Sequence, residues 1–170
     1  AGPTGLPDLR FARMVHVESA AEMFEAVSSR AAEQDIIVKA AAVADYTPAE
    51  VSGEKIKKKE GDLSIPLKRT TDILAWLGAH RRAGQFLCGF SMETENVLAN
   101  SRAKLARKGV DMIAANSLRT AGAGFAGDTN VLTLITEDRE EELPLMSKDE
   151  AAHRLLDAIL REMGAADGNA

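Results

Sequence analysis

The chain has 170 residues, of which 45% are hydrophobic and 28% charged, and its formal net charge at pH 7 is -5. This length suits one domain with a substantial core, since domains usually have about 100–200 residues. The acidic balance argues against broad binding to nucleic acid, which needs a basic surface. No apolar run reaches the ~20 residues of a membrane span and no signal peptide opens the chain, so we expect a cytoplasmic protein with no membrane partner.

The first segments of the chain predict two strands around a helix. Residues 14–17 form a short β-like run, and the helix after it begins at a capping box made by Ser19 and Glu22. Apolar residues then recur at helical spacing. Residues 35–43 form a near-continuous apolar run, which is typical of a parallel strand covered on both faces.

A long loop is expected next, over residues 45–62, because this segment is polar and lysine-rich and contains Pro and Gly. Residues 63–67 predict a short edge strand. Thr70 or Thr71 is expected to cap the following helix, and residues 85–90 predict another strand.

The second half of the chain continues the alternation. Thr94 is expected to cap a helix that stops at Gly109, and Ser147 with Glu150 forms a second capping box before the last helix. Strands are expected at three places, residues 110–115, 131–136 and, as a short strand, 142–145. A glycine-rich connection lies between the first two of these strands.

This pattern predicts an α/β fold, a three-layer α/β/α arrangement with a mainly parallel, Rossmann-like sheet and right-handed crossovers. We expect residues 1–163 to form a single domain and residues 164–170 to be a frayed tail. Ligands of such folds lie at the carboxyl ends of the strands. Those ends carry Asp45, the segment from Gly89 to Thr94, and Asn116.

Basic residues gather in two clusters of this acidic chain, which suits a small polyanion, although a solvated surface is the ordinary explanation of a charge run. The first cluster contains Lys55, Lys57, Lys58 and Lys59, and the second contains Lys104, Arg107 and Lys108. Mobile ammonium groups on a loop could close over a triphosphate and stabilise its leaving group. Lys104 and Lys108 share a helix face and could hold an anion between them.

Other chemistries have little support in the sequence. The three histidines are scattered, so no metal site is expected. The single cysteine, Cys88, excludes an intramolecular disulfide and lies in an apolar strand, where packing is a better explanation than nucleophilic catalysis. No complete dinucleotide fingerprint or Walker loop is present, and spacing alone does not separate CTP from ATP.

Several segments, in this order, resemble the phosphopantothenate–cysteine ligase (phosphopantothenoylcysteine synthetase) family. In bacteria this family is commonly the carboxyl-terminal half of a bifunctional flavoprotein. The matching stretches are residues 40–46, 54–59, 71–74, 89–90, 93–94, 111–116, 124–125 and 128–135, together with Lys104 and Lys108.

The resemblance implies ligation of 4′-phosphopantothenate to cysteine with CTP as co-substrate and Mg²⁺ accompanying the triphosphate. The substrate carboxylate attacks the α-phosphorus to give an acyl-cytidylate and pyrophosphate, and the cysteine amine then displaces CMP. The resemblance also implies a homodimer and a fused or associated flavin decarboxylase, the only part that would bind FMN.

The resemblance assigns roles to residues of this chain. Lys55, Lys57 and Lys58 are similar to the lysines of the family's catalytic lid. The nucleotide-binding positions are Ala42, Asp45, Lys55, Thr71, Asp72, Ile73, Leu74, Phe90, Lys104 and Lys108. Among them, Asp45 is expected to contact the base or ribose, and Phe90 is expected to line the nucleotide pocket.

Two departures from the family pattern bear on these expectations. Thr70 and Thr71 stand where the family more commonly has asparagine and proline. The strand, glycine-rich turn and Asn-x-Ser-Ser-Gly stretch that begin family members are also missing from this sequence, so we expect the fragment alone to be inactive. One alternative is a non-catalytic nucleotide-binding or dimerisation fragment. Another, a nicotinamide-dependent oxidoreductase, lacks the required glycine fingerprint and acidic ribose-binding residue.

Overall fold

The computed structural model describes residues 1–57, 61–93, 96–117 and 127–167. The chain divides into two units, the first made of Ala1–Ser29 and Ala41–Ile73, and the second made of Arg30–Ala40 and Leu74–Ala170. Among the described residues, no helix has the length and apolar character that crossing a membrane requires. The expectation of one domain over residues 1–163 stays a prediction.

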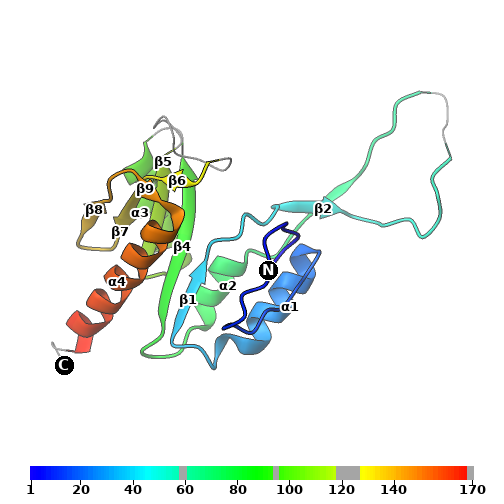
Figure 1. Cartoon of the computed structure of the whole chain (residues 1–170). Coiled ribbons are helices and arrows are strands. Elements are labelled where there is room, and N and C mark those ends of the chain that lie inside the picture. Colours follow the sequence, from blue (N-terminus) through cyan, green and yellow to red (C-terminus); the bar gives the residue numbers. More distant parts are fainter. Residues whose placement is uncertain (58–60, 94–95, 118–126, 168–170) are drawn as a thin grey trace. The chain divides into compact units, whose positions relative to one another are not determined.

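The second unit is built on a five-stranded sheet with the strand order β1-β4-β5-β7-β8 (Figure 1). The strands are β1 (Ile36–Lys39), β4 (Phe86–Glu93), β5 (Met112–Ser117), β7 (Leu132–Ile135) and β8 (Glu140–Glu142). Strand β4 pairs in parallel with both β1 and β5, whereas β7 pairs antiparallel with β5 and β8. The predicted parallel core is confirmed, and an antiparallel hairpin extends it.

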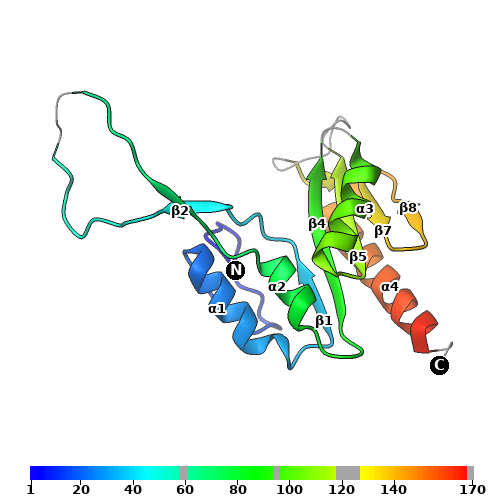
Figure 2. The ribbon, with the colours of Figure 1, turned by 180° about the vertical axis from the view of Figure 1, so that it is seen from behind.

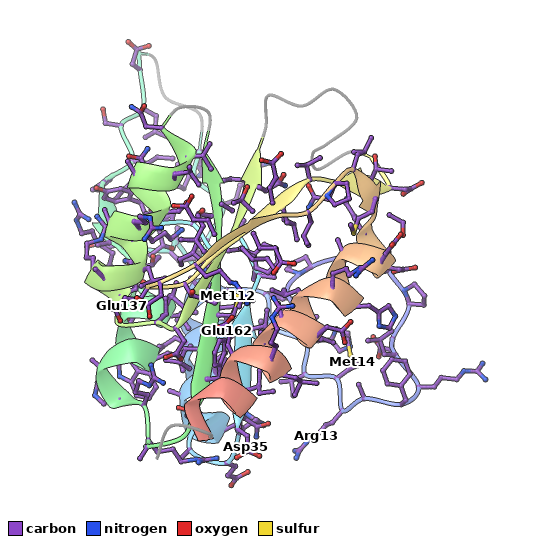
Figure 3. All side chains as sticks on the ribbon, turned by 90° about the vertical axis from the view of Figure 1, so that its left-hand side faces the viewer. Arg13, Met14, Asp35, Met112, Glu137 and Glu162 are labelled. Carbon is purple, nitrogen blue, oxygen red and sulfur yellow. The ribbon has the colours of Figure 1, made fainter. Side chains whose placement is uncertain are left out.

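Helices cover both faces of this sheet. Helix α3 (Val97–Lys108) and helix α4 (Lys148–Asp167) lie on opposite faces, as the two opposed views show (Figures 1 and 2). A third view places Met112 of β5 on the sheet between these two helices (Figure 3). The predicted three-layer α/β/α arrangement is therefore confirmed.

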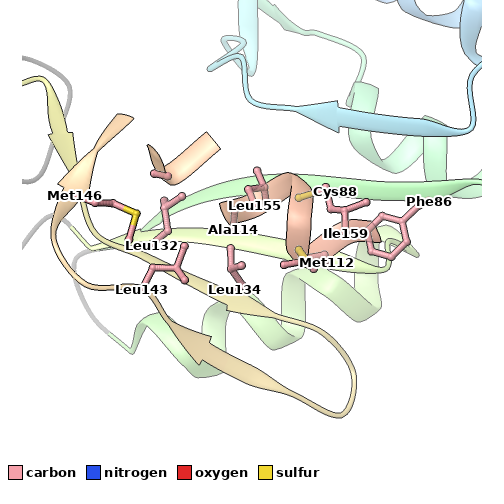
Figure 4. Close-up of a cluster of buried hydrophobic side chains, with 12 residues drawn as sticks. Phe86, Cys88, Met112, Ala114, Leu132, Leu134, Leu143, Met146, Leu155 and Ile159 are labelled. Atoms are coloured by element: carbon pink, nitrogen blue, oxygen red, sulfur yellow. The ribbon is translucent and has the colours of Figure 1, made fainter. Parts of the chain in front are cut away.

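The core beneath α4 follows from the alternation of side chains along a strand, which places every second residue on the same face. Phe86 and Cys88 of β4 join Met112 and Ala114 of β5 in one apolar cluster (Figure 4). The helix contributes every third or fourth residue to this cluster, namely Ala151, Leu155, Ala158 and Ile159. This spacing places the apolar residues of the last helix in one buried stripe.

Helix α2 (Ile73–His80) packs on β4 at a position that only glycine can occupy without a shift of its neighbours. A Cβ atom on Gly89 would lie 2.4 Å from Cδ2 of Leu74. A Cβ atom on Gly78 would lie 1.8 Å from the carbonyl oxygen of Lys108, at the end of α3. The two glycines therefore let α2 approach both the sheet and α3 closely, because a side chain at Gly89 would displace the Leu74 side chain and one at Gly78 would collide with backbone atoms.

The first unit contains most of α1 (Ala20–Ala31) and a two-stranded antiparallel ribbon of β2 (Tyr46–Pro48) and β3 (Leu67–Arg69). The predicted capping box at the start of α1 is confirmed, because the Glu22 N–H donates to Oγ of Ser19 at 3.2 Å. A long connection joins β2 to β3 and projects from the ribbon (Figure 1). The second capping box is also confirmed, since the Glu150 N–H donates to Oγ of Ser147 at 3.1 Å.

Several predicted strand boundaries are wrong because strand length depends on pairing partners. Residues 14–17 form no strand, and the backbone bonds described for them go to Ala1. The predicted strand 35–43 shortens to β1, which pairs with β4 at four positions and leaves Val38 36% exposed at the edge of the described sheet. Strand β4 extends to Glu93, beyond the expected end at Phe90, so Phe90 lies inside the strand and not at its end.

Smaller corrections concern the hairpins, the helix ends and the tail. The expected loop 45–62 includes β2, the expected strand 63–67 is replaced by β3, and the expected strand 142–145 is replaced by β8. Helix α4 continues to Asp167, beyond the expected start of the tail. Gly109 ends α3 in a left-handed conformation with φ 61°, as predicted, whereas Thr94 and residues 118–126 lie outside the described residues.

A two-stranded pair leads into α4. Strand β6 (Thr129–Asn130) pairs antiparallel with β9 (Met146–Ser147), which ends where the helix begins. This pair fixes the start of α4 and thereby the register of its buried stripe on the sheet.

Candidate functional site

The first unit ties two predicted nucleotide-binding segments together. Oγ1 of Thr70 donates to the carbonyl oxygen of Ala44 at 2.6 Å, and the Thr70 N–H donates to the carbonyl oxygen of Asp45 at 2.9 Å. These bonds place Asp45 beside the segment that holds Thr71 and Asp72. Because its hydroxyl is engaged with Ala44, Thr70 is not the predicted cap of α2, which begins at Ile73, directly after Asp72.

The ribbon next to this junction supports the same arrangement. Tyr46 stands opposite Arg69, and the Arg69 guanidinium lies 5.3 Å from the centroid of the Tyr46 ring. A cation at this distance from an aromatic face is attracted by the ring electrons. The junction between Asp45 and Thr70 is therefore held on one side by paired strands.

Ala42 lines a cavity of about 410 Å³ in the first unit. The cavity lies between the first residues of the chain, the start of α1 and the segment 41–44. Cavities of about 300–1,000 Å³ are typical of small-molecule sites. A backbone N–H just before α1 already has a partner from the helix itself, since the Glu22 carboxylate accepts a bond from the Glu18 N–H at 2.8 Å. That bond lowers the pKa of Glu22.

The predicted lid lysines lie on the connection between β2 and β3. Lys55 and Lys57 are exposed, and Lys58 lies outside the described residues. The Ala49 N–H donates to the Pro66 carbonyl at 2.9 Å, which closes the base of the connection. Exposed lysines on a long connection anchored by a ribbon are consistent with a segment that could close over an anion.

The second unit brings together the remaining predicted residues. Nζ of Lys104, on α3, donates to the carbonyl oxygen of Phe90, on β4, at 2.9 Å. Leu74 packs on Gly89, the residue before Phe90. Lys108 lies one turn after Lys104 and is half-buried, with its carbonyl against Gly78. Two consecutive residues of β4 are therefore contacted by predicted site residues. Leu74 packs on Gly89, and Lys104 bonds to Phe90.

Burial excludes Cys88 as an ionised nucleophile near neutral pH. The side chain is fully buried, and loss of solvent raises the pKa of the thiol to about 12. The prediction that Cys88 is a packing residue agrees with this environment. Among the described residues, no group of three or more His, Cys, Asp or Glu side chains could hold a metal ion.

Sequence reasoning left Asn116 outside the predicted site, although it noted the position after a strand. The structure places Asn116 within β5 and buries its Oδ1, for which the described residues offer no hydrogen-bond partner. A strand pattern in the sequence indicates that a polar residue is near the end of a strand, but the absence of a partner depends on neighbours from other strands.

A second cavity, of about 580 Å³, lies at the amino ends of β4 and β5 and contains none of the predicted site residues. Its floor includes the ion pair between Arg81 and Asp111, whose atoms Nη1 and Oδ1 are 2.9 Å apart. The Asp111 carboxylate also accepts a bond from the Leu87 N–H at 2.7 Å. These bonds fix the crossover between α2 and the sheet, which is a structural role.

Comparison with models of protein families shows to which family this chain belongs. The model of the DNA/pantothenate metabolism flavoprotein C-terminal domain family matches residues 1–163. The chain belongs to this family. The predicted resemblance is therefore confirmed at the level of the family.

Individual relatives agree with this assignment. The coenzyme A biosynthesis bifunctional protein CoaBC of Bacillus subtilis is 43% identical over 161 residues, which are 94% of this chain and 39% of the relative. A cysteine/cysteine sulfinic acid decarboxylase from an unknown prokaryotic organism is 42% identical over 161 residues, which are 94% of this chain and 45% of that protein. The chain thus spans less than half the length of these two family members.

A solved structure shows that the fold is shared as well. The crystal structure of the C-terminal domain of CoaBC superposes with a TM-score of 0.77 at 39% sequence identity, and the match covers 98% of this chain and 74% of that chain. A Cab2 mutant in complex with phosphopantothenate-cysteine gives a TM-score of 0.71 at 15% identity, which shows a common fold alone. The predicted Rossmann-like α/β fold is therefore confirmed for this family member.

Proposed function

We propose that this chain is the nucleotide-handling part of a phosphopantothenate–cysteine ligase and uses CTP to join 4′-phosphopantothenate to cysteine. The observation that carries the proposal is the match of residues 1–163 to the family, combined with the bond from Lys104 to the Phe90 carbonyl. That bond joins two positions that the resemblance assigns to nucleotide binding. The CoaBC relative, whose name places it in coenzyme A biosynthesis, supports the substrate class.

In the proposed first step, a carboxylate oxygen of 4′-phosphopantothenate attacks the α-phosphorus of CTP. The bond from this phosphorus to the bridging oxygen breaks, and pyrophosphate leaves with the electron pair. Lys55, Lys57 and Lys58 of the long connection would offset the negative charge that develops on the leaving group. Lys104 and Lys108 would hold phosphate oxygens from α3, because ammonium groups bind phosphate as compact point charges.

In the proposed second step, the cysteine amine attacks the acyl carbon of the acyl-cytidylate. The acyl–oxygen bond breaks, CMP leaves and the amine loses a proton, so that an amide remains. Asp45 and the segment Thr71, Asp72, Ile73 and Leu74 would hold the nucleoside part, together with Phe90. Ala42 would contribute its backbone near the intermediate, at the cavity of the first unit.

Mg²⁺ fits this site as a companion of the triphosphate. The described residues offer no cluster of three metal-binding side chains, and Mg²⁺ usually keeps waters and substrate phosphates as ligands, with one or two carboxylates from the protein. It would supply charge neutralisation at the phosphates. Asp45 and Asp72 are the acidic residues of the proposed site that could reach it.

The proposal extends to partners and location. The relatives named bifunctional support a fused or associated flavin decarboxylase, which would hold the FMN. A homodimer and a cytoplasmic location are part of the same proposal, as is the absence of nucleic-acid and membrane partners. A non-catalytic nucleotide-binding or dimerisation fragment is the alternative function, and it predicts CTP binding without pyrophosphate release.

Ligation activity tests the proposal and separates it from the alternative. The longer protein that contains this chain should release pyrophosphate only when CTP, 4′-phosphopantothenate and Mg²⁺ are all present, and it should form the amide when cysteine is added. Lys55→Ala should abolish this release. CTP binding without pyrophosphate release in the unaltered longer protein would favour the non-catalytic alternative.

A further inference from the structure

The side chain of Asn116 lies on the face of the sheet that α4 covers. Met112 and Ala114 of the same strand belong to the apolar cluster under α4, and side chains two residues apart share a face. In the register of the sheet, Asn116 stands between Met92 of β4 and Leu132 of β7. By this register the amide stands beyond the apolar side chains of Met112 and Ala114, which Figure 4 shows.

The apolar core ends at this row. Leu132, on one side of Asn116, is 3% exposed, whereas Met92, on the other side, is 36% exposed. Oδ1 of Asn116 is nevertheless buried and has no hydrogen-bond partner. A buried acceptor without a donor destabilises a folded protein, because it loses its bonds to water and gains none. Such an atom in a native fold calls for a group that donates to it.

The neighbourhood of Asn116 indicates what that group is. Phe90 lies one row below on the same face, stands opposite Ala114 and is partly buried against the cluster. Aromatic side chains stack on nucleobases, and the Phe90 carbonyl is bonded to the ammonium of Lys104. The Phe90 ring and the Asn116 amide oxygen therefore lie on the same face of the sheet, in adjacent rows near the carboxyl ends of two parallel strands, where ligands of such sheets bind. The Lys104 ammonium reaches the same strand from α3, on the other face.

We propose that Asn116 is a specificity-determining residue, whose amide oxygen accepts a hydrogen bond from the exocyclic amino group of the bound nucleobase. This inference rests on the proposed function, because it takes the ligand to be a nucleoside triphosphate. Cytosine carries an amino donor at its 4-position, whereas uracil carries a carbonyl acceptor there. Asn116 therefore favours CTP over UTP, since a site built to bond a donor leaves its own acceptor unpaired when the donor is missing.

Three variants test the assignment in titrations of the longer protein that contains this chain with CTP and UTP in the presence of Mg²⁺. Asn116→Leu removes the amide at similar volume and should weaken CTP binding roughly tenfold with little effect on UTP. Asn116→Asp keeps an oxygen that only accepts and should preserve the preference for CTP. This second variant matters because an amide can turn and present its nitrogen, whereas a carboxylate has no donor to present.

Asn130→Leu is the matched control, because the Asn130 oxygen has a partner and accepts a bond from the Val131 N–H at 3.0 Å. Its loss should lower the melting temperature and leave the ratio of CTP to UTP affinity unchanged. Without nucleotide, Asn116→Leu should instead keep or raise the melting temperature, because it removes a buried acceptor that has no partner.

The results separate this inference from the function on which it rests. Unchanged discrimination between CTP and UTP in Asn116→Leu would overturn the role of Asn116 while the proposed function stands. A lower melting temperature for Asn116→Leu, equal to that of Asn130→Leu, would show that the amide is satisfied in the fold and would also overturn it. No CTP binding by the unaltered longer protein would overturn both proposals.

Discussion

The ammonium of Lys104 donates to the carbonyl oxygen of Phe90 at 2.9 Å, and this bond connects helix α3 to the strand that it covers. The carbonyl belongs to the interior of β4, where Phe90 stands opposite Ala114. The side chain of Lys104 is half-buried, and this bond places its ammonium next to the sheet. Lys104 can therefore hold α3 on β4, and we propose that it also presents charge to a phosphate.

Lys104→Met should weaken CTP binding about tenfold or more, because a hydrogen bond to a charged group contributes about 1.5–3 kcal/mol. Titration calorimetry with CTP and Mg²⁺ measures the change. Arg107→Met removes one positive charge from the same helix at an exposed position and should change binding little. Equal losses in both variants would show that only the overall charge of α3 matters.

Gly89→Ala should destabilise the protein by about 1–3 kcal/mol, as overpacking of a core does. The added methyl would lie 2.4 Å from Cδ2 of Leu74 and 3.3 Å from Cδ1 of Ile113. Urea unfolding followed by circular dichroism measures the difference. Gly53→Ala is the control, because nothing lies within 4 Å of a Cβ atom there. A neutral Gly89→Ala would contradict the close packing of α2 on β4.

Cys88 should resist alkylation by iodoacetamide at pH 8 in the folded protein and react once the chain is unfolded. Its thiol is fully buried, and the loss of solvent raises its pKa to about 12, so very little thiolate exists at that pH. Mass spectrometry of the intact chain counts the added groups with and without denaturant. Rapid labelling of the native protein would show that β4 opens readily.

Glu22 should make the stability of α1 depend on pH in the acidic range. The bond from the Glu18 N–H, followed by the one from the Ser19 hydroxyl, holds its pKa below the ordinary value for a glutamate. A carboxyl whose pKa is lower in the folded state stabilises that state above its unfolded pKa, about 4.3, and loses this effect as the pH falls through the folded value.

Glu22→Gln should therefore lower the melting temperature at pH 7 and reduce its fall between pH 5 and pH 3. Thermal unfolding by circular dichroism at these pH values measures both effects. Glu25→Gln removes a carboxylate from the interior of the same helix and should leave the acid dependence as it is. An unchanged pH profile in Glu22→Gln would contradict the capping role of this carboxylate.

The sequence was sufficient for features that local patterns determine. Capping by Ser19 and Ser147 and the stop at Gly109 depend on residues within a few positions of one another, and the structure confirms them. The parallel core of the sheet could also be predicted, because alternating strands and helices leave few other arrangements.

Features that depend on pairing between distant segments could not be predicted in this way. The apolar run after Asp35 is strand-like throughout, but β1 extends only as far as its register with β4. The hydroxyl of Thr70 could have capped α2, but a carbonyl 26 residues earlier in the chain takes it instead. The missing partner of Asn116 is likewise a property of its neighbours in the sheet and not of the residue itself.

The resemblance to a family supplied most of the predicted site, and the structure arranges these residues in two groups. In the first unit, the bonds of Thr70 hold Asp45 beside Thr71 and Asp72. In the second unit, Leu74, Phe90 and Lys104 gather along β4. The roles of the individual residues in each group stay predictions.

Limited proteolysis in the presence of nucleotide tests the central claim most directly, namely that this chain surrounds CTP with the lysines of its long connection. Trypsin cleaves after exposed lysines such as Lys55 and Lys57. With Mg²⁺ present, CTP should protect these sites, with UTP giving less protection at the same concentration. Cleavage at Lys55 and Lys57 at the same rate with and without saturating CTP would contradict the account.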